Sequence, residues 1–191
     1  MSCQRWCVTS RTYSKPWGTR VDAIIGFAFL NQTAFTIDYQ SKKISVGPID
    51  PSLAAIPYEA YQGFPLVEMK IRQRSVRLLV DTGAPDLVLF EGATRDCLDA
   101  IGIAGTRTGS NMSGDIRFQL VKVADVYLGS MPWGTRDAFI LADSGGNRPS
   151  ELQGLLGVIS LKARRVGFDP EHKIFAWDLL SGSSQLAREA P

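Results

Sequence analysis

The chain has 191 residues, enough for one domain of ordinary size or for one domain and part of another. Its 21 basic and 19 acidic residues give a net charge of +2, which argues against a dedicated nucleic-acid surface. Hydrophobic residues make up 45% of the chain and there are 18 glycines, a composition that favours a compact, turn-rich β protein over a helical bundle or a disordered chain.

Residues 1–20 are polar and lack periodicity, so we expect a disordered head there. This head has no apolar core of the ~7 to 15 residues that a signal peptide needs. No apolar run in the chain reaches the ~18 to 20 residues of a membrane span. We therefore expect no membrane span, and the sequence leaves the localisation open.

A metal site is not expected. The three cysteines, Cys3, Cys7 and Cys97, cannot all pair, and His172 is the only histidine. We interpret Cys97 as a small buried apolar residue and His172 as a solvated turn residue. The sequence predicts neither a metal nor an organic cofactor.

The first segment with a regular pattern is residues 21–47. An apolar stretch that ends at Gly26, a second short apolar stretch, and the runs 35–39 and 43–46 predict a strand, a Gly turn, a short helix and a β-hairpin. The same pattern recurs 131 positions later, which we interpret as a second copy of one closing module. The matched pairs are Gly26 with Gly157, Leu30 with Leu161, and Asp38 with Asp169.

Between the two copies, the apolar run Leu78-Leu79-Val80 leads directly into Asp81-Thr82-Gly83, and a second apolar run spans 87–90. A strand cannot continue through this turn, because Gly83 frees the backbone and Pro85 lacks an N–H group. The pattern places Asp81 at a tight turn between two buried strands, where a carboxylate is costly unless it is paired or used. The candidate catalytic residues are Asp81, Thr82 and Gly83.

This stretch of apolar residues followed by Asp-Thr-Gly-Ala resembles the active-site motif of the retropepsin-like aspartyl proteases. The resemblance implies an all-β fold, a small closed barrel of the acid-protease type with short helices. It also implies an aspartic endopeptidase acting on a polypeptide substrate, in which two carboxylates share a proton: one activates a water and the other protonates the scissile carbonyl. In such a site Thr82 locks the loop through its hydroxyl, and Gly83 lets two facing loops approach.

The resemblance also divides the chain, because the closing half of such a domain is an apolar-Gly stretch, a short helix and a final hairpin. Residues 56–180 are expected to form a complete domain. Residues 21–47 are interpreted as the remnant of the C-terminal half of a preceding, apparently truncated domain of a bacterial-type tandem protease. Residues 48–55, with two prolines, are the expected linker, and residues 181–191 a polar tail.

Within residues 56–180, segments 64–71 and 76–80 are predicted strands joined by a turn. Helical spacing runs from Ala93 to Ile101, and a long polar stretch, with Gly and Asn residues that free the backbone, covers 104–114. Further strands are predicted at 116–123, 126–129 and 138–141. The family resemblance assigns a substrate-covering flap to the neighbourhood of residues 106–115.

A second candidate motif is Asp143-Ser144-Gly145, because aspartic proteases also use Asp-Ser-Gly. We consider it less favourable, because it follows Asp81 by only 62 positions, a polar segment follows it, and Leu155-Leu156-Gly157 already holds the symmetry-related position. Asp38 and Asp169 predict Asx-type hairpin turns rather than catalysis. Two departures from the family pattern are Ile159, where Asp is common, and Pro85, where a small hydroxyl residue is common.

The complete domain has one carboxylate in the motif setting. The sequence therefore predicts that a second chain completes the dyad, as a homodimer that brings Asp81 of each copy to a twofold axis and pairs the copies at a terminal strand. The alternative is a catalytically inactive interaction domain on the same scaffold, because a fold does not by itself imply chemistry.

Overall fold

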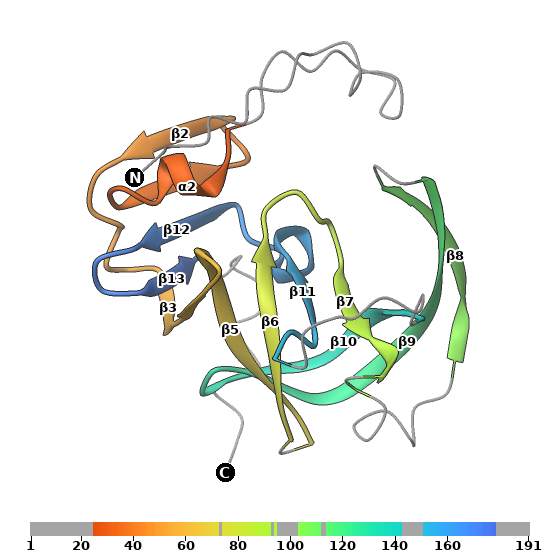
Figure 1. Ribbon diagram of the computed structural model, residues 1–191. Coiled ribbons are helices and arrows are strands. Elements are labelled where there is room, and N and C mark those ends of the chain that lie inside the picture. Colours follow the sequence, from red (N-terminus) through yellow and green to blue (C-terminus); the bar gives the residue numbers. More distant parts are fainter. Residues whose placement is uncertain are drawn as a thin grey trace.

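The computed structural model describes residues 25–72, 74–92, 94, 103–111, 114–142 and 151–178. These residues are almost entirely β-structure (Figure 1), which confirms the prediction of an all-β fold with short helices. Short helical turns occur at α2 (Phe27–Leu30) and η1 (Val158–Leu161). The strands are β1 (Phe35–Asp38), β2 (Lys43–Val46), β3 (Ala54–Pro57), β4 (Glu59–Tyr61), β5 (Phe64–Ile71), β6 (Arg74–Asp81), β7 (Leu87–Phe90), β8 (Ile103–Asn111), β9 (Gly114–Leu128), β10 (Met131–Leu141), β11 (Gly154–Gly157), β12 (Arg165–Asp169) and β13 (Ile174–Trp177).

The described strands form two sheets. The larger has the strand order β4-β5-β6-β11-β7-β10-β9-β8, and it closes into a barrel because β5 also pairs with β9. The smaller has the order β2-β1-β12-β13-β3 and lies to one side of the barrel in Figure 1. Strand β11 is inserted between β6 and β7, parallel to the first and antiparallel to the second.

The barrel interior is filled by alternating side chains. In β6, Val76, Leu78 and Val80 are buried while the residues between them are more accessible, as expected for a strand with one face in the core. All four residues of β7 are buried, because Leu87 and Leu89 enter the main core while Val88 and Phe90 join a second cluster with Phe139. The Asp81 turn is therefore held on both sides by buried strands.

The structure adds one strand and merges others. Residues 104–111, part of a polar stretch for which the sequence predicts no strand, form most of β8, which pairs with β9 in a long hairpin. Their polar, glycine-containing sequence has little apolar patterning, so the strand is specified by its backbone pairing with the alternating residues of β9. The strand predicted at 126–129 is the end of β9, and β10 begins at Met131 rather than 138. Most of the predicted helix at 93–101 lies outside the described residues.

The two copies of the closing module fold alike and pair with each other. Strand β1 pairs antiparallel with β12, and Thr36 lies opposite Gly167, which is its own counterpart 131 positions later. Such a self-matching pair requires a local twofold axis between the two hairpins. On one side of this axis Phe35 stacks on Phe168, with ring centroids 5.0 Å apart, and both rings are buried.

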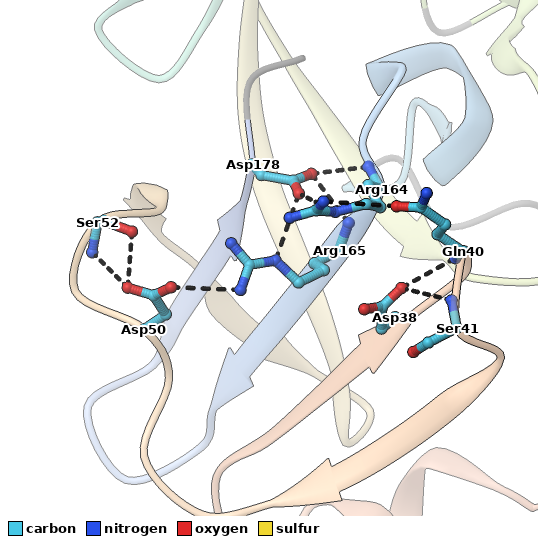
Figure 2. Close-up of polar contacts among 8 residues, drawn as sticks. All are labelled: Asp38, Gln40, Ser41, Asp50, Ser52, Arg164, Arg165 and Asp178. Atoms are coloured by element: carbon cyan, nitrogen blue, oxygen red, sulfur yellow. Dashed lines mark hydrogen bonds and ion pairs between the residues drawn. The ribbon is translucent and has the colours of Figure 1, made fainter. Parts of the chain in front are cut away.

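Polar contacts also tie the first module to the rest of the chain (Figure 2). Asp178 accepts hydrogen bonds from the backbone N–H groups of Arg164 and Arg165 at 2.7 and 2.9 Å. The Arg165 guanidinium lies 3.3 Å from both Asp178 and Asp50, and Arg164 donates to Gln40 at 3.4 Å. Gln40 and Asp50 are thus anchored to Arg164 and Arg165 at the start of β12, which Asp178 holds in turn. The division into remnant, linker and complete domain stays a prediction.

The turns of the two hairpins confirm the expected Asx chemistry. Asp38 accepts hydrogen bonds from the N–H groups of Gln40 and Ser41, both at 2.9 Å. Asp169 accepts from the corresponding groups of Glu171 and His172, both at 3.1 Å. These bonds to its charged form lower the pKa of Asp38, the Ser41 N–H contributing most.

The two equivalent glycines give a matched test of the fold. Both have extended backbones, with φ of −71° at Gly26 and −73° at Gly157. A Cβ on Gly157 would lie 2.3 Å from the Asp86 carbonyl oxygen and 2.6 Å from that of Ala84, whereas a Cβ on Gly26 meets nothing within 4 Å. We expect Gly157→Ala to lower the free energy of unfolding by about 1–3 kcal/mol, because it overpacks backbone against backbone. Gly26→Ala should change it by less than about 0.5 kcal/mol. Urea unfolding of both variants is the measurement, and equal stabilities would contradict the close packing at Gly157.

Candidate active site

Asp81 is the last residue of β6, and its position is fixed by the strand beside it. It lies opposite Gly157 in the parallel pairing of β6 with β11. After the turn the chain enters β7, on the other side of β11. Because β11 separates the two arms, the turn spans it at the end of the strands (Figure 1). Backbone hydrogen bonding from Gly157 N–H to the Asp86 carbonyl at 3.0 Å holds the far end of the turn.

The carboxylate of Asp81 organises the turn itself. Its Oδ1 accepts hydrogen bonds from the N–H groups of Gly83 at 2.9 Å and Ala84 at 3.2 Å. Asp81 is half-buried, while Thr82 and Gly83 are exposed. Within the described residues, Oδ2 makes no hydrogen bond to protein, so one carboxylate oxygen is fixed and the other is available.

The structure thus brings Asp81, Thr82 and Gly83 together in one turn. A Cβ on Gly83 would lie 3.4 Å from Asp81 Oδ1, so the glycine gives the carboxylate room to accept both N–H groups. In the described part of the chain Thr82 makes its polar contact through its carbonyl oxygen, which accepts from Tyr39. A lock made by the Thr82 hydroxyl remains a prediction for a state with a facing loop.

Tyr39 is a residue of this site that the sequence did not indicate. It directly follows β1, in the first closing module, and its hydroxyl donates to the Thr82 carbonyl at 3.5 Å. Partial burial, and secondarily the negative charge of Asp81, raise the pKa of Tyr39 to about 12. The second module has Pro170 at the equivalent position. This difference between the two copies is the sequence feature that could have pointed to Tyr39.

The hairpin expected to hold the flap is linked to the same turn. Arg107 on β8 forms an ion pair with Asp86, with 3.2 Å between Nη1 and Oδ2, and its guanidinium lies 5.3 Å from the centre of the Phe139 ring. The pair is largely exposed, so it contributes no more than about 1 kcal/mol. It orients the β8–β9 hairpin relative to the Asp81 turn rather than stabilising the fold.

The other candidates of the sequence take no part in this turn. Asp143-Ser144-Gly145 and Cys97 lie outside the described residues. His172 is exposed in the β12–β13 turn, where Nδ1 lies 2.8 Å from an Asp169 carboxylate oxygen, and this contact raises the pKa of the imidazole. Among the described residues no group of His, Cys, Asp and Glu side chains could hold a metal ion. No described helix is long and apolar enough to cross a membrane.

No protein-family model and no curated protein matches the sequence. Among solved structures, the chain is similar to the crystal structure of a retropepsin-like aspartic protease from Rickettsia conorii. The TM-score is 0.45 and the identity 16%, over 66% of this chain and 91% of that one. The case for a function therefore depends on the geometry of the Asp81 turn.

The coupling between Tyr39 and Asp81 can be tested without any enzyme assay. We expect Asp81→Asn to lower the pKa of Tyr39 from about 12, because the mutation removes a negative charge that disfavours the phenolate. The pKa should stay above the ordinary value of about 10, because burial is the larger cause. Absorbance titration of the phenolate, with Tyr39→Phe subtracted to isolate this residue, is the measurement. An unchanged pKa would show that the two groups do not interact.

Proposed function

We propose that the chain is one part of an aspartic endopeptidase, with Asp81 as a catalytic carboxylate. The observation that carries this proposal is the turn itself: a half-buried aspartate at the end of a buried strand, with one oxygen fixed by two N–H groups. A carboxylate held on rigid strands with one oxygen available is suited to activating a water molecule.

Peptide hydrolysis in this scheme needs a second carboxylate facing Asp81. Two carboxylates that face each other within hydrogen-bonding distance share one proton, because both cannot be ionised so close together. The ionised group takes a proton from the attacking water, and the protonated group donates its proton to the carbonyl oxygen of the scissile bond. The polypeptide substrate would lie between the Asp81 turn and the β8–β9 hairpin.

The source of the second carboxylate is constrained by strand β1. The homodimer expected from the sequence uses a terminal strand, but the edge of β12 is already paired with β1 of the same chain. An intact second copy would have to displace β1 and the Phe35–Phe168 stack to reach this edge. This favours a different arrangement. Another polypeptide supplies a segment equivalent to residues 52–153, with its own Asp-Thr-Gly turn. This segment, the front half, combines with the first closing module to form a second lobe that faces the Asp81 turn.

Asp81→Asn should abolish cleavage of an unstructured polypeptide at acidic to neutral pH, because an amide cannot exchange the proton. The fold should survive, since the amide oxygen can still accept from Gly83 and Ala84. Asp137→Asn is the matched control: it removes an exposed carboxylate that pairs with Lys122 on β9, far from the turn in sequence. Equal cleavage by wild type and Asp81→Asn would refute the catalytic role of Asp81.

An extended chain tests the need for a facing carboxylate. In it, residues 52–153 are duplicated directly in front of Ala23, which matches Gly154 in the repeat. We expect cleavage to rise by roughly 10²-fold or more over the original chain, since a second acid–base group is supplied. Asp→Asn in either copy of the motif should remove the gain. An extended chain that unfolds cooperatively yet gains no activity would contradict the proposed dyad.

The second candidate function is a non-catalytic interaction domain. It is favoured by one observation: Gly26, the counterpart of Gly157, has open space around it, so the described part of this chain presents no loop there. The two candidates differ in a single result. An interaction domain would bind polypeptide equally as wild type and as Asp81→Asn, without cleavage by the chain or by its extended form.

A further inference from the structure

Equivalent positions in the two closing modules differ sharply in exposure. Ile44 is 45% exposed and Val46 71%, whereas their counterparts Phe175 and Trp177 are 0% and 3% exposed. Ile25 is 54% exposed, against 0% for its counterpart Leu156. The first module therefore has apolar side chains at positions that are covered in the second.

The cover in the second module is a known segment of this chain. Strand β3 pairs antiparallel with β13, with Ile56 opposite Phe175 and Ala54 opposite Trp177. Strand β2, the counterpart of β13, is the last strand of the same sheet, and no described strand pairs with its outer edge. An exposed apolar edge strand is a template for pairing with another strand.

The backbone of β2 is oriented to accept such a strand. The Gly47 N–H donates to the Ala34 carbonyl at 2.8 Å, so by antiparallel alternation Ser45 bonds with β1 while Ile44 and Val46 direct their N–H and C=O groups outward. In the second module the Tyr58 N–H donates to the Lys173 carbonyl at 2.8 Å, which directs the corresponding groups of Phe175 and Trp177 toward β3. Both hairpins thus present the same hydrogen-bonding edge.

A second opening lies on the same module. The counterpart of Gly26 is packed against the backbone of Ala84 and Asp86, at the end of the Asp81 turn, while Gly26 has nothing within 4 Å of a Cβ position. The segments that cover the second module, β3 and the turn at 84–86, both belong to the front half of the lobe. One partner could therefore close both openings.

We propose that the outer edge of β2, with Ile25, Ile44 and Val46, is the docking surface for the front half of a second lobe, whose opening strand adds antiparallel to β2 as β3 adds to β13. The partner's strand has the chemistry of β3: small residues followed by a β-branched apolar residue, able to lie against Ile44 and Val46. This inference rests on the proposed function and specifies where its partner binds, but binding at β2 does not depend on catalysis.

A second intact copy does not fit this surface. The edge of β3 that would pair with β2 is already bonded to β13 within its own chain. Pairing of β2 with β2 of a second copy would cover the strand edge but would place no loop backbone against Gly26. Complementarity to both openings requires a segment with a free opening strand.

The test uses the full chain and a labelled synthetic peptide with the sequence of residues 51–59, which spans β3. We expect saturable binding by fluorescence anisotropy. Amide hydrogen exchange, resolved by residue, should be fast at Ile44 and Val46 in the free chain and slow with peptide bound, because these N–H groups become ladder donors. Ser45, already bonded to β1, should change little.

Matched variants distinguish peptide binding at the edge of β2 from nonspecific hydrophobic binding. Val46→Lys should weaken peptide binding by roughly tenfold or more, whereas Tyr127→Lys, at an apolar residue of β9 that is 43% exposed, should not. Val46→Pro removes an outward N–H without touching the bonds to β1, so it should also abolish binding while the fold is retained. The Asp81→Asn chain should bind the peptide as wild type does, which separates this inference from the catalytic proposal.

Three results would overturn the proposal: no peptide binding, binding that Val46→Lys and Val46→Pro leave unchanged, or slow exchange at Ile44 and Val46 in the free chain. The last would show that the edge is already covered by the chain itself or by a second copy. Sedimentation distinguishes the two: if a second copy covers the edge, wild type sediments as a dimer and Val46→Pro as a monomer.

Discussion

The close approach of β11 to the Asp81 turn is the constraint on which the rest of the site depends. A parallel strand inserted between β6 and β7 forces the connecting chain to cross over it, and the crossing is possible because Gly157 presents no side chain to the backbone of Ala84 and Asp86. With the turn pressed against β11, the N–H groups of Gly83 and Ala84 point back to the carboxylate that precedes them. The geometry of Asp81 is therefore a consequence of strand order and one glycine.

The twofold pairing of β1 with β12 extends this constraint to the first module. Because the two modules meet at the self-matching pair of Thr36 and Gly167, every feature of one has a defined counterpart in the other. Differences between the modules then identify what is specific to each. Tyr39, in place of Pro170, reaches the Thr82 carbonyl, and Ile44 and Val46 stay exposed where Phe175 and Trp177 are buried. The same symmetry makes an isologous homodimer at β12 costly, since the chain already satisfies this edge internally.

Much of this architecture could be predicted from the sequence, and the failures have physical causes. Apolar runs flanking Asp-Thr-Gly predicted both arms of the turn. The module that recurs at an offset of 131 positions predicted the two hairpins and their Asx turns, because these features depend on local sequence. Strand β8 was missed because its polar, glycine-containing sequence is ordered by its partner β9 and not by its own periodicity. Tyr39 was missed for a similar reason: its contact joins residues 43 positions apart and exists only once β1 pairs with β12.

In the proposed function, the hydrogen bonds within the turn hold the Asp81 carboxylate in position before a second carboxylate is bound. Two facing carboxylates repel each other unless they share a proton, so a preassembled pair costs stability, whereas Asp81 alone is stabilised by the two N–H groups of its own turn. The cost arises only when the facing loop arrives. In the proposed arrangement that cost is offset by burial of Ile44 and Val46 and by new strand hydrogen bonds at β2. On this proposal, the exposed edge of β2 and the single carboxylate at Asp81 belong to one arrangement, in which binding at β2 would provide the free energy that brings a second carboxylate to Asp81.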